Sequence, residues 1–148
     1  MFGWQEWLQV LSGFVGTIGF GILFNIRGRR LLLAALGGFL SWMLFLLLGF
    51  FIQDEIVRYF IVSVAVSVYA EVLARIVKTP TTTFCIVSLI PLIPGGSLYY
   101  SMRYALEGQS ENFVQKAVYT LGLAAALSLG IVLVSAVMRY VNSRQWKK

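Results

Sequence analysis

Five long apolar segments follow one another along the chain, separated by short polar connections. An α-helix of roughly 20 apolar residues is long enough to cross the hydrocarbon core of a bilayer. The pattern therefore predicts one all-α domain over residues 1–148, a polytopic integral membrane protein with five transmembrane helices. The expected spans are residues 7–24, 31–52, 56–76, 84–104 and 117–137.

The fourth segment, residues 84–104, contains two prolines at its centre, Pro91 and Pro94. Proline has no backbone N–H and crowds the preceding helical turn, so we expect the carbonyl groups of Val87 and Ile90 to lose their helical partners. Hydrocarbon cannot satisfy such groups, so the break must face protein or a water-filled cavity. Discontinuous helices of this kind bind substrates near the bilayer midplane in many transporters.

Gly95, Gly96 and Ser97 follow these prolines directly. We expect the helix to restart here, with Ser97 as its cap and the N–H groups of all three residues facing the gap. The positive end of a helix favours an anion such as a carboxylate. The freed carbonyls before the break would suit an ammonium or hydroxyl group, so the break as a whole fits a zwitterionic amino acid. The alternative is a simple kink without a transport role.

The composition agrees with a membrane protein. Of 148 residues, 59% are hydrophobic and 12% are charged, whereas soluble domains carry about 25% charged residues. The spans leave no room for a separate soluble domain.

The net charge of +6 raises the question of nucleic-acid binding, but the basic residues are distributed as in a membrane protein. Nine lysines and arginines fall in the connection after the first span, the connection after the third span, and the C-terminal tail: Arg27, Arg29, Arg30, Arg75, Lys78, Arg139, Arg144, Lys147 and Lys148. Three fall on the other side: Arg58, Arg103 and Lys116. By the positive-inside rule, the N-terminus is outside and the C-terminus is cytoplasmic. We expect no nucleic-acid partner.

Glu71 is the one carboxylate placed inside an apolar segment, and Arg75 follows it by one helical turn. Ionisable residues within a span commonly belong to substrate pathways or proton relays. Residues at this spacing share a helix face and can pair. Two interpretations remain open: Glu71 couples transport to protons with Arg75 beside it, or the two form a structural pair.

Thr81, Thr82 and Thr83 follow Pro80 at the entrance of the fourth segment. Hydroxyl side chains at such a position are usually helix caps. The alternative is a polar vestibule that contacts a hydrophilic substrate.

Small residues recur at four-residue spacing in the first segment (Gly13, Thr17, Gly21) and the last (Gly122, Ala126, Gly130). Such faces let helices approach closely in lipid. They serve either packing within the chain or contact with a second subunit, including a second copy in a homo-oligomer.

Catalysis is not expected. The chain has no histidine, and none of its lysines falls inside an expected span, so Ser97 lacks a base to activate it as a nucleophile. Cys85 is the single cysteine, and no metal-ligand spacing is present. We expect no metal and no cofactor.

The residues described above are similar to those of the threonine/serine exporter family, and of its small-subunit type in particular. That type resembles the C-terminal half of longer, fused exporters. The resemblance covers nearly the whole chain, and its strongest element is Ile90-Pro91-Leu92-Ile93-Pro94-Gly95-Gly96-Ser97-Leu98-Tyr99. It also includes the glycine-rich first segment, Tyr69-Ala70-Glu71 with Arg75, and Pro80-Thr81-Thr82-Thr83.

The resemblance implies a pair formed with a larger membrane subunit, and export of small hydrophilic metabolites driven by an ion gradient. It favours threonine or serine as solute, with dicarboxylate (succinate) export as the alternative. The site residues carried over are Glu71, Arg75, the three threonines and the break. A bacterial inner-membrane location is expected. The rival interpretation is a subunit that only assembles or stabilises a separate transporter.

Overall fold

The computed structural model describes residues 3–145, with side chains described as far as Val141. The described chain is helical and contains no strand. Its elements are α1 (Trp4–Leu23), α2 (Arg29–Gly49), α3 (Glu55–Val77), α4 (Thr81–Leu89), the 3₁₀ turn η1 (Ile90–Leu92), α5 (Gly95–Leu106) and α6 (Ser110–Gln145).

Four of these helices are long and apolar enough to cross a membrane: α1, α2, α3 and α6. The fifth span is the pair formed by Thr81–Leu92 and Gly95–Leu106, which meet at a bend of 56°. The prediction of an all-α membrane protein with a broken fourth span is confirmed.

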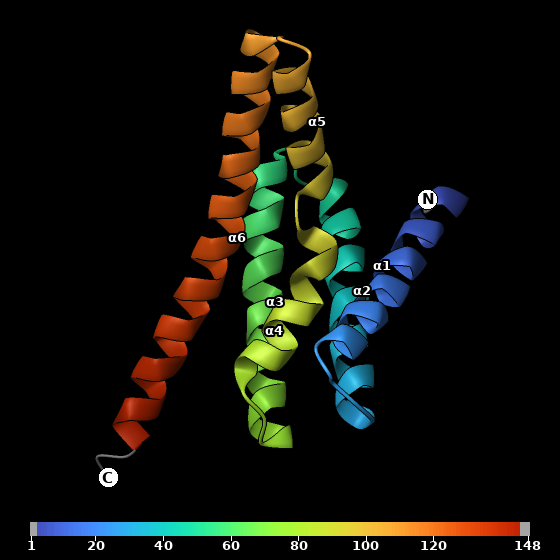
Figure 1. The fold of residues 1–148 in the computed structure, drawn as a ribbon. Helices are drawn as coiled ribbons and strands as arrows, with labels where there is room; N and C mark the ends of the chain where they lie inside the picture. The colour runs from blue at the N-terminus through green and yellow to red at the C-terminus, as the bar shows by residue number, and fades with distance from the viewer. Residues whose placement is uncertain (1–2, 146–148) are drawn as a thin grey trace.

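The helices run up and down in a bundle with α3 near its centre, where it contacts α2, α4 and α6 (Figure 1). The α1–α2 connection, the α3–α4 connection and the C-terminal part of α6 lie at one end. We call this the basic end, because it carries Arg27, Arg29, Arg30, Arg75, Lys78 and Arg139. The opposite end carries the α2–α3 and α5–α6 turns, and we call it the hairpin end. The predicted clustering of basic residues therefore holds; Lys147, Lys148 and the Arg144 side chain lie outside the described residues.

The last helix differs most from its predicted bounds. It begins at Ser110 rather than residue 117 and extends to Gln145 rather than residue 137. Its 36 residues measure about 54 Å, well beyond the ~30 Å of a hydrocarbon core. Hydropathy identifies only the apolar part of a helix. The backbone of α6 stays helical through the polar residues on both sides of that part, so the helix is longer than predicted.

Because of this length, α6 and α5 extend together past the ends of α2 and α3 at the hairpin end (Figure 1). In this region α5 packs against α6. The turn between them passes through Gly108, whose φ of +70° is a conformation that glycine adopts without strain.

Small residues bring the helices of the bundle together. A Cβ atom on Gly38 of α2 would overlap the Thr17 side chain of α1, and a Cβ atom on Gly130 of α6 would overlap the Ser63 hydroxyl of α3. The predicted small-residue faces of the first and last spans therefore pack within the chain, since helices without such side chains can approach more closely.

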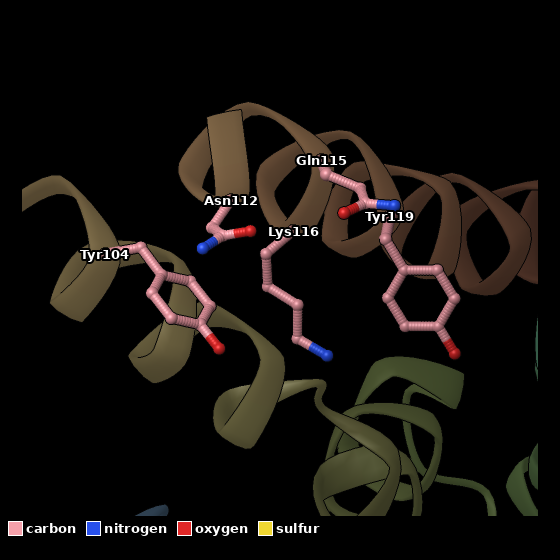
Figure 2. A pocket seen from close by; sticks show the side chains of 5 residues that line it. All are labelled: Tyr104, Asn112, Gln115, Lys116 and Tyr119. Carbon is pink, nitrogen blue, oxygen red and sulfur yellow. The ribbon is translucent and has the colours of Figure 1, made fainter. Parts of the chain in front are cut away.

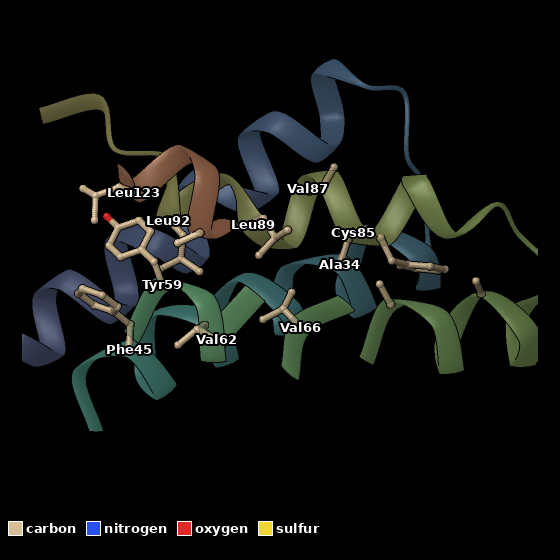
Figure 3. Packing of buried hydrophobic residues seen from close by; sticks show 14 of the residues in the cluster. Ala34, Phe45, Tyr59, Val62, Val66, Cys85, Val87, Leu89, Leu92 and Leu123 are labelled. Atoms are coloured by element: carbon tan, nitrogen blue, oxygen red, sulfur yellow. The ribbon is translucent and has the colours of Figure 1, made fainter. Parts of the chain in front are cut away.

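The buried core lies where α2, α3, α4 and α6 meet (Figure 3). Leu92, the last residue of η1, is fully buried in it, as are Val62 and Phe84, and Leu123 is nearly so. Burial of Leu92 fixes the broken span to its neighbours just before the bend.

Arg58 lies at the hairpin end, where its guanidinium carbon is 4.7 Å from the centroid of the Phe45 ring. Its Nη1 atom is close to Gly49, the last residue of α2. A cation stacked on an aromatic ring and placed at a helix C-terminus is favourable on both counts.

Candidate solute site

The break begins as a tightened helix rather than an opened one. Pro91 lies within η1, where the N–H of Ile90 donates to the carbonyl of Val87 and the N–H of Ile93 donates to the carbonyl of Ile90 at 3.1 Å. The prediction that these two carbonyls lack partners is wrong. Hydrogen bonds of the 3₁₀ type, in which a carbonyl accepts from the N–H three residues later, replace the α-helical bonds that proline removes. Neither carbonyl is therefore left unpaired for a solute ammonium.

The chain then extends at Ile93 (ψ 123°) and turns into α5 at Pro94. The N–H of Gly95 donates to the carbonyl of Ile93 at 2.6 Å, which leaves the N–H groups of Gly96 and Ser97 in the first turn of α5. Pro94 occupies the capping position, and α5 has no side-chain cap. The prediction that Ser97 caps this helix is therefore wrong, because α5 starts two residues earlier.

Open space surrounds the two glycines that follow the prolines. A Cβ atom on Gly95 or on Gly96 would meet no atom of the chain within 4 Å. A Cβ atom therefore fits at both positions without a clash inside this protein.

A cavity of about 540 Å³ lies between α3, α4 and α6. It contains three residues predicted from sequence, Glu71, Thr81 and Thr82, and it reaches the break at Ile93. The α6 side supplies a row spaced by four residues: Leu127, Ile131, Ser135 and Arg139. The cavity thus extends from the start of α4 at the basic end to the bend in the middle of the broken span.

Glu71 and Arg75 form an ion pair, with Arg75 Nε 4.0 Å from Glu71 Oε2. The Glu71 side chain is 17% exposed and that of Arg75 is 47% exposed. Arg75 also reaches α6, where its Nη2 lies 3.7 Å from the sulfur of Met138. The carboxylate is the more enclosed partner and lines the cavity, while the guanidinium lies at its outer side.

Arg139 is the charged residue that sequence reasoning missed. It was assigned to the tail because it follows the apolar segment, yet α6 continues through it. Residues four apart share one helix face. This spacing could have placed Arg139 on the same face as Leu127, Ile131 and Ser135. The row changes from apolar to polar at Ser135, and its polar residues line the same cavity as Glu71 of α3.

The threonines line two different cavities. Thr81 and Thr82 line the large cavity, whereas Thr83, together with Thr82, lines a smaller one of about 220 Å³ beside Phe24 and Ile26. The prediction that these hydroxyls cap α4 is wrong, because α4 begins after Pro80 and has no side-chain cap. The vestibule alternative agrees with the placement of Thr81 and Thr82.

The residues of the break point in more than one direction. Pro91 faces α1 and α2, where it shares a cavity of about 350 Å³ with Gly13 and Trp42. Ile93 is the residue of the break that lines the large cavity. Gly95, Gly96 and Ser97 belong to the first turn of α5 beyond it.

Comparison with protein families identifies a match over most of the chain. A family model described as threonine/serine exporter, ThrE, matches residues 9–137. This range includes every residue predicted from sequence to contact solute, and it ends two residues before Arg139. No curated protein matches the chain, and no solved structure matches it.

Proposed function

Because the chain belongs to the threonine/serine exporter family, we propose that it is the small subunit of a secondary-active exporter of small hydrophilic metabolites, with threonine or serine as solute. Its apolar helices make it a multi-pass membrane protein, and its family is one of transporters. The finer assignment rests on the cavity between α3, α4 and α6.

The chemistry of that cavity is what supports an amino acid with a hydroxyl side chain. Arg139 offers a guanidinium for the carboxylate, since paired N–H donors bind carboxylates in a bidentate manner. Thr81 and Ser135 offer hydroxyl groups for the solute hydroxyl. Glu71 offers a carboxylate for the ammonium. One zwitterionic hydroxy amino acid satisfies all of these groups.

Glu71 is also our choice for proton coupling. It is the carboxylate that lines the cavity. Arg75 of α3 forms an ion pair with it, and Arg139 of α6 lines the same cavity. A proton on Glu71 would weaken its hold on a solute ammonium, so that protonation and solute release are linked. Arg75 tunes Glu71 through their ion pair.

The break remains part of the proposed path. Ile93 joins it to the cavity, and the N–H groups of Gly96 and Ser97 at the start of α5 are the next donors that a departing carboxylate meets. Pro91 and Pro94 hold the bend that presents them.

We further propose a larger membrane subunit of the same family as partner, a bacterial inner-membrane location, an outside N-terminus and a cytoplasmic C-terminus. The basic end supports this orientation. The α5–α6 extension past α2 and α3 (Figure 1) supports a partner, because α6 is the main packing partner of α5 among the described helices. A homo-oligomer is the other assembly that would cover it.

Succinate is the second candidate solute, and one observation favours it. Arg75 and Arg139 bring two guanidinium groups to the neighbourhood of one cavity. A dicarboxylate would use both, with Glu71 protonated.

Efflux of labelled threonine, with succinate in parallel, tests the proposal. Cells that lack their own exporters express this chain alone or with the larger subunit. Efflux that needs both chains supports a two-component exporter, and the better solute identifies its class. If neither solute leaves although both chains are inserted, the transport role is refuted and a subunit that only assembles the complex takes its place.

A further inference from the structure

A second polar cavity lies at the hairpin end, between α5 and the beginning of α6 (Figure 2). Its volume is about 320 Å³, and it is lined by Tyr104, Asn112, Gln115, Lys116 and Tyr119. Two phenols, two carboxamides and an ammonium thus gather at the end of the molecule opposite Arg139. The sequence pattern placed Lys116 only as one of three basic residues on this side, and it predicted solute contact for none of the five.

Lys116 is the charged group of this cavity. Its side chain is half-buried, and its ammonium lies 5.1 Å from the centroid of the Tyr119 ring. Among the described residues, ion pairs join Arg75 to Glu71 and Arg103 to Glu107, and neither includes Lys116. The nearby carboxylate of Glu55 accepts a hydrogen bond from the Tyr119 hydroxyl instead. A cation over an aromatic face, without a carboxylate partner, is suited to an incoming anion.

The acceptor side of the cavity is held in place by a chain of hydrogen bonds. Asn112 Nδ2 donates to Gln109 Oε1 at 2.8 Å, and Gln109 Nε2 donates to Glu107 Oε2 at 3.0 Å. Glu107 in turn binds Arg103 at 2.7 Å. This chain orients the Asn112 amide and leaves its carbonyl oxygen as an acceptor on the side of Lys116, as Figure 2 shows.

We propose that this cavity is a second solute site, in which Lys116 binds the carboxylate of a small hydrophilic solute and Asn112 accepts a hydrogen bond from its ammonium or hydroxyl group. The inference rests on the proposed exporter function for the identity of the solute. It assigns the hairpin end as the face from which the solute is released, because Lys116 lies toward the opposite end of α6 from Arg139.

Threonine exchange measured separately from each face of the membrane tests this site. The full chain, with its larger subunit, is used in right-side-out and inside-out vesicles. Lys116→Gln should raise the half-saturating threonine concentration at the hairpin-end face by about tenfold or more, since a charge-assisted contact is lost. The value at the opposite face should stay within about twofold. Lys116→Arg keeps the charge and should restore most of the affinity.

Glu111→Gln is the control. It removes a charge from the same end of the molecule, but Glu111 is exposed, does not line the cavity and takes no part in the hydrogen bonds that orient Asn112. Both faces should then behave as in the unmodified protein. Equal losses at both faces for Lys116→Gln, or no loss at either, would overturn the site.

A labelling experiment separates failure of the site from failure of the exporter function. Gln115→Cys, in a Cys85→Ser background, places one thiol in the cavity for a water-soluble maleimide. Protection by threonine or serine supports the site even if exchange is absent, in which case the exporter function alone fails. Exchange without protection overturns the site and leaves the exporter function standing. Protection by anionic lipid vesicles, but not by threonine, serine or succinate, would make it a headgroup site and overturn the proposal.

Discussion

The hydroxyl group of Ser88 on α4 donates a hydrogen bond of 3.2 Å to the carbonyl oxygen of Ala34 on α2. Both residues are fully buried. The contact depends on Gly37, because a Cβ atom there would overlap the Ser88 side chain and lie 2.9 Å from the Tyr69 ring. The half of the broken span that lines the Glu71 cavity is therefore held against α2 by close backbone approach.

Gly37→Ala should destabilise the protein by about 1–3 kcal/mol, because the added methyl group has no space between α2 and α4. Unfolding of the purified protein in mixed detergent measures this change. Gly16→Ala is the matched control, since a Cβ atom on Gly16 meets nothing within 4 Å. Equal stability of the two variants would mean that α2 and α4 are not in close contact.

Arg139→Gln should raise the half-saturating solute concentration at the basic end by about tenfold or more, because the solute carboxylate loses its charged donor. Efflux or exchange kinetics give the value, and membrane insertion should be unchanged. Arg139→Lys should recover only part of the affinity, since an ammonium does not reproduce the fork of a guanidinium. Unchanged kinetics in Arg139→Gln would remove this residue from the site.

Glu71→Gln should abolish the response of transport to an imposed proton gradient, because the amide cannot take up the coupled proton. Solute exchange without a gradient should persist in part. Arg75→Gln separates the two interpretations of the ion pair. If Glu71 is only a structural partner, both substitutions should reduce stability equally and leave the response to the proton gradient unchanged.

Gly95→Val should stop export without impairing insertion or folding. The space around Gly95 is open within this chain, so the added side chain obstructs the proposed path instead of the packing. Export is measured beside the amount of inserted protein. Normal export by Gly95→Val would show that solute does not pass in front of the first turn of α5.

The sequence predicts correctly those features that depend only on residues close together in the chain. The length and apolar character of a segment identify a span, because a helix must match the thickness of the hydrocarbon core. Proline interrupts a helix at any interior position because it has no backbone N–H. The prediction that the carbonyls of Val87 and Ile90 lack hydrogen-bond partners was wrong. A turn with hydrogen bonds of the 3₁₀ type satisfies them, and the last residue of that turn, Leu92, is fully buried.

The candidate site was foreseen only in part. Glu71 was identifiable because a carboxylate in an apolar segment is unusual, and Thr81 and Thr82 because they open the next helix. Arg139 was not, because hydropathy ends the last span before it. Lys116 was not predicted to bind solute either, because the apolar segment of the same helix begins after it.

The sequence by itself determined the five spans, the position of the break and the end of the molecule at which basic residues gather, since each follows from side chains and their neighbours along the chain. Only the tertiary structure decided which side chains share a cavity. It brings Glu71 of α3, Thr81 of α4 and Arg139 of α6 together, and it turns Thr83 and Pro91 toward α1. Those groupings depend on the rotation and tilt of each helix, which the packing of Gly38 on Thr17 and of Gly130 on Ser63 fixes across long separations in sequence.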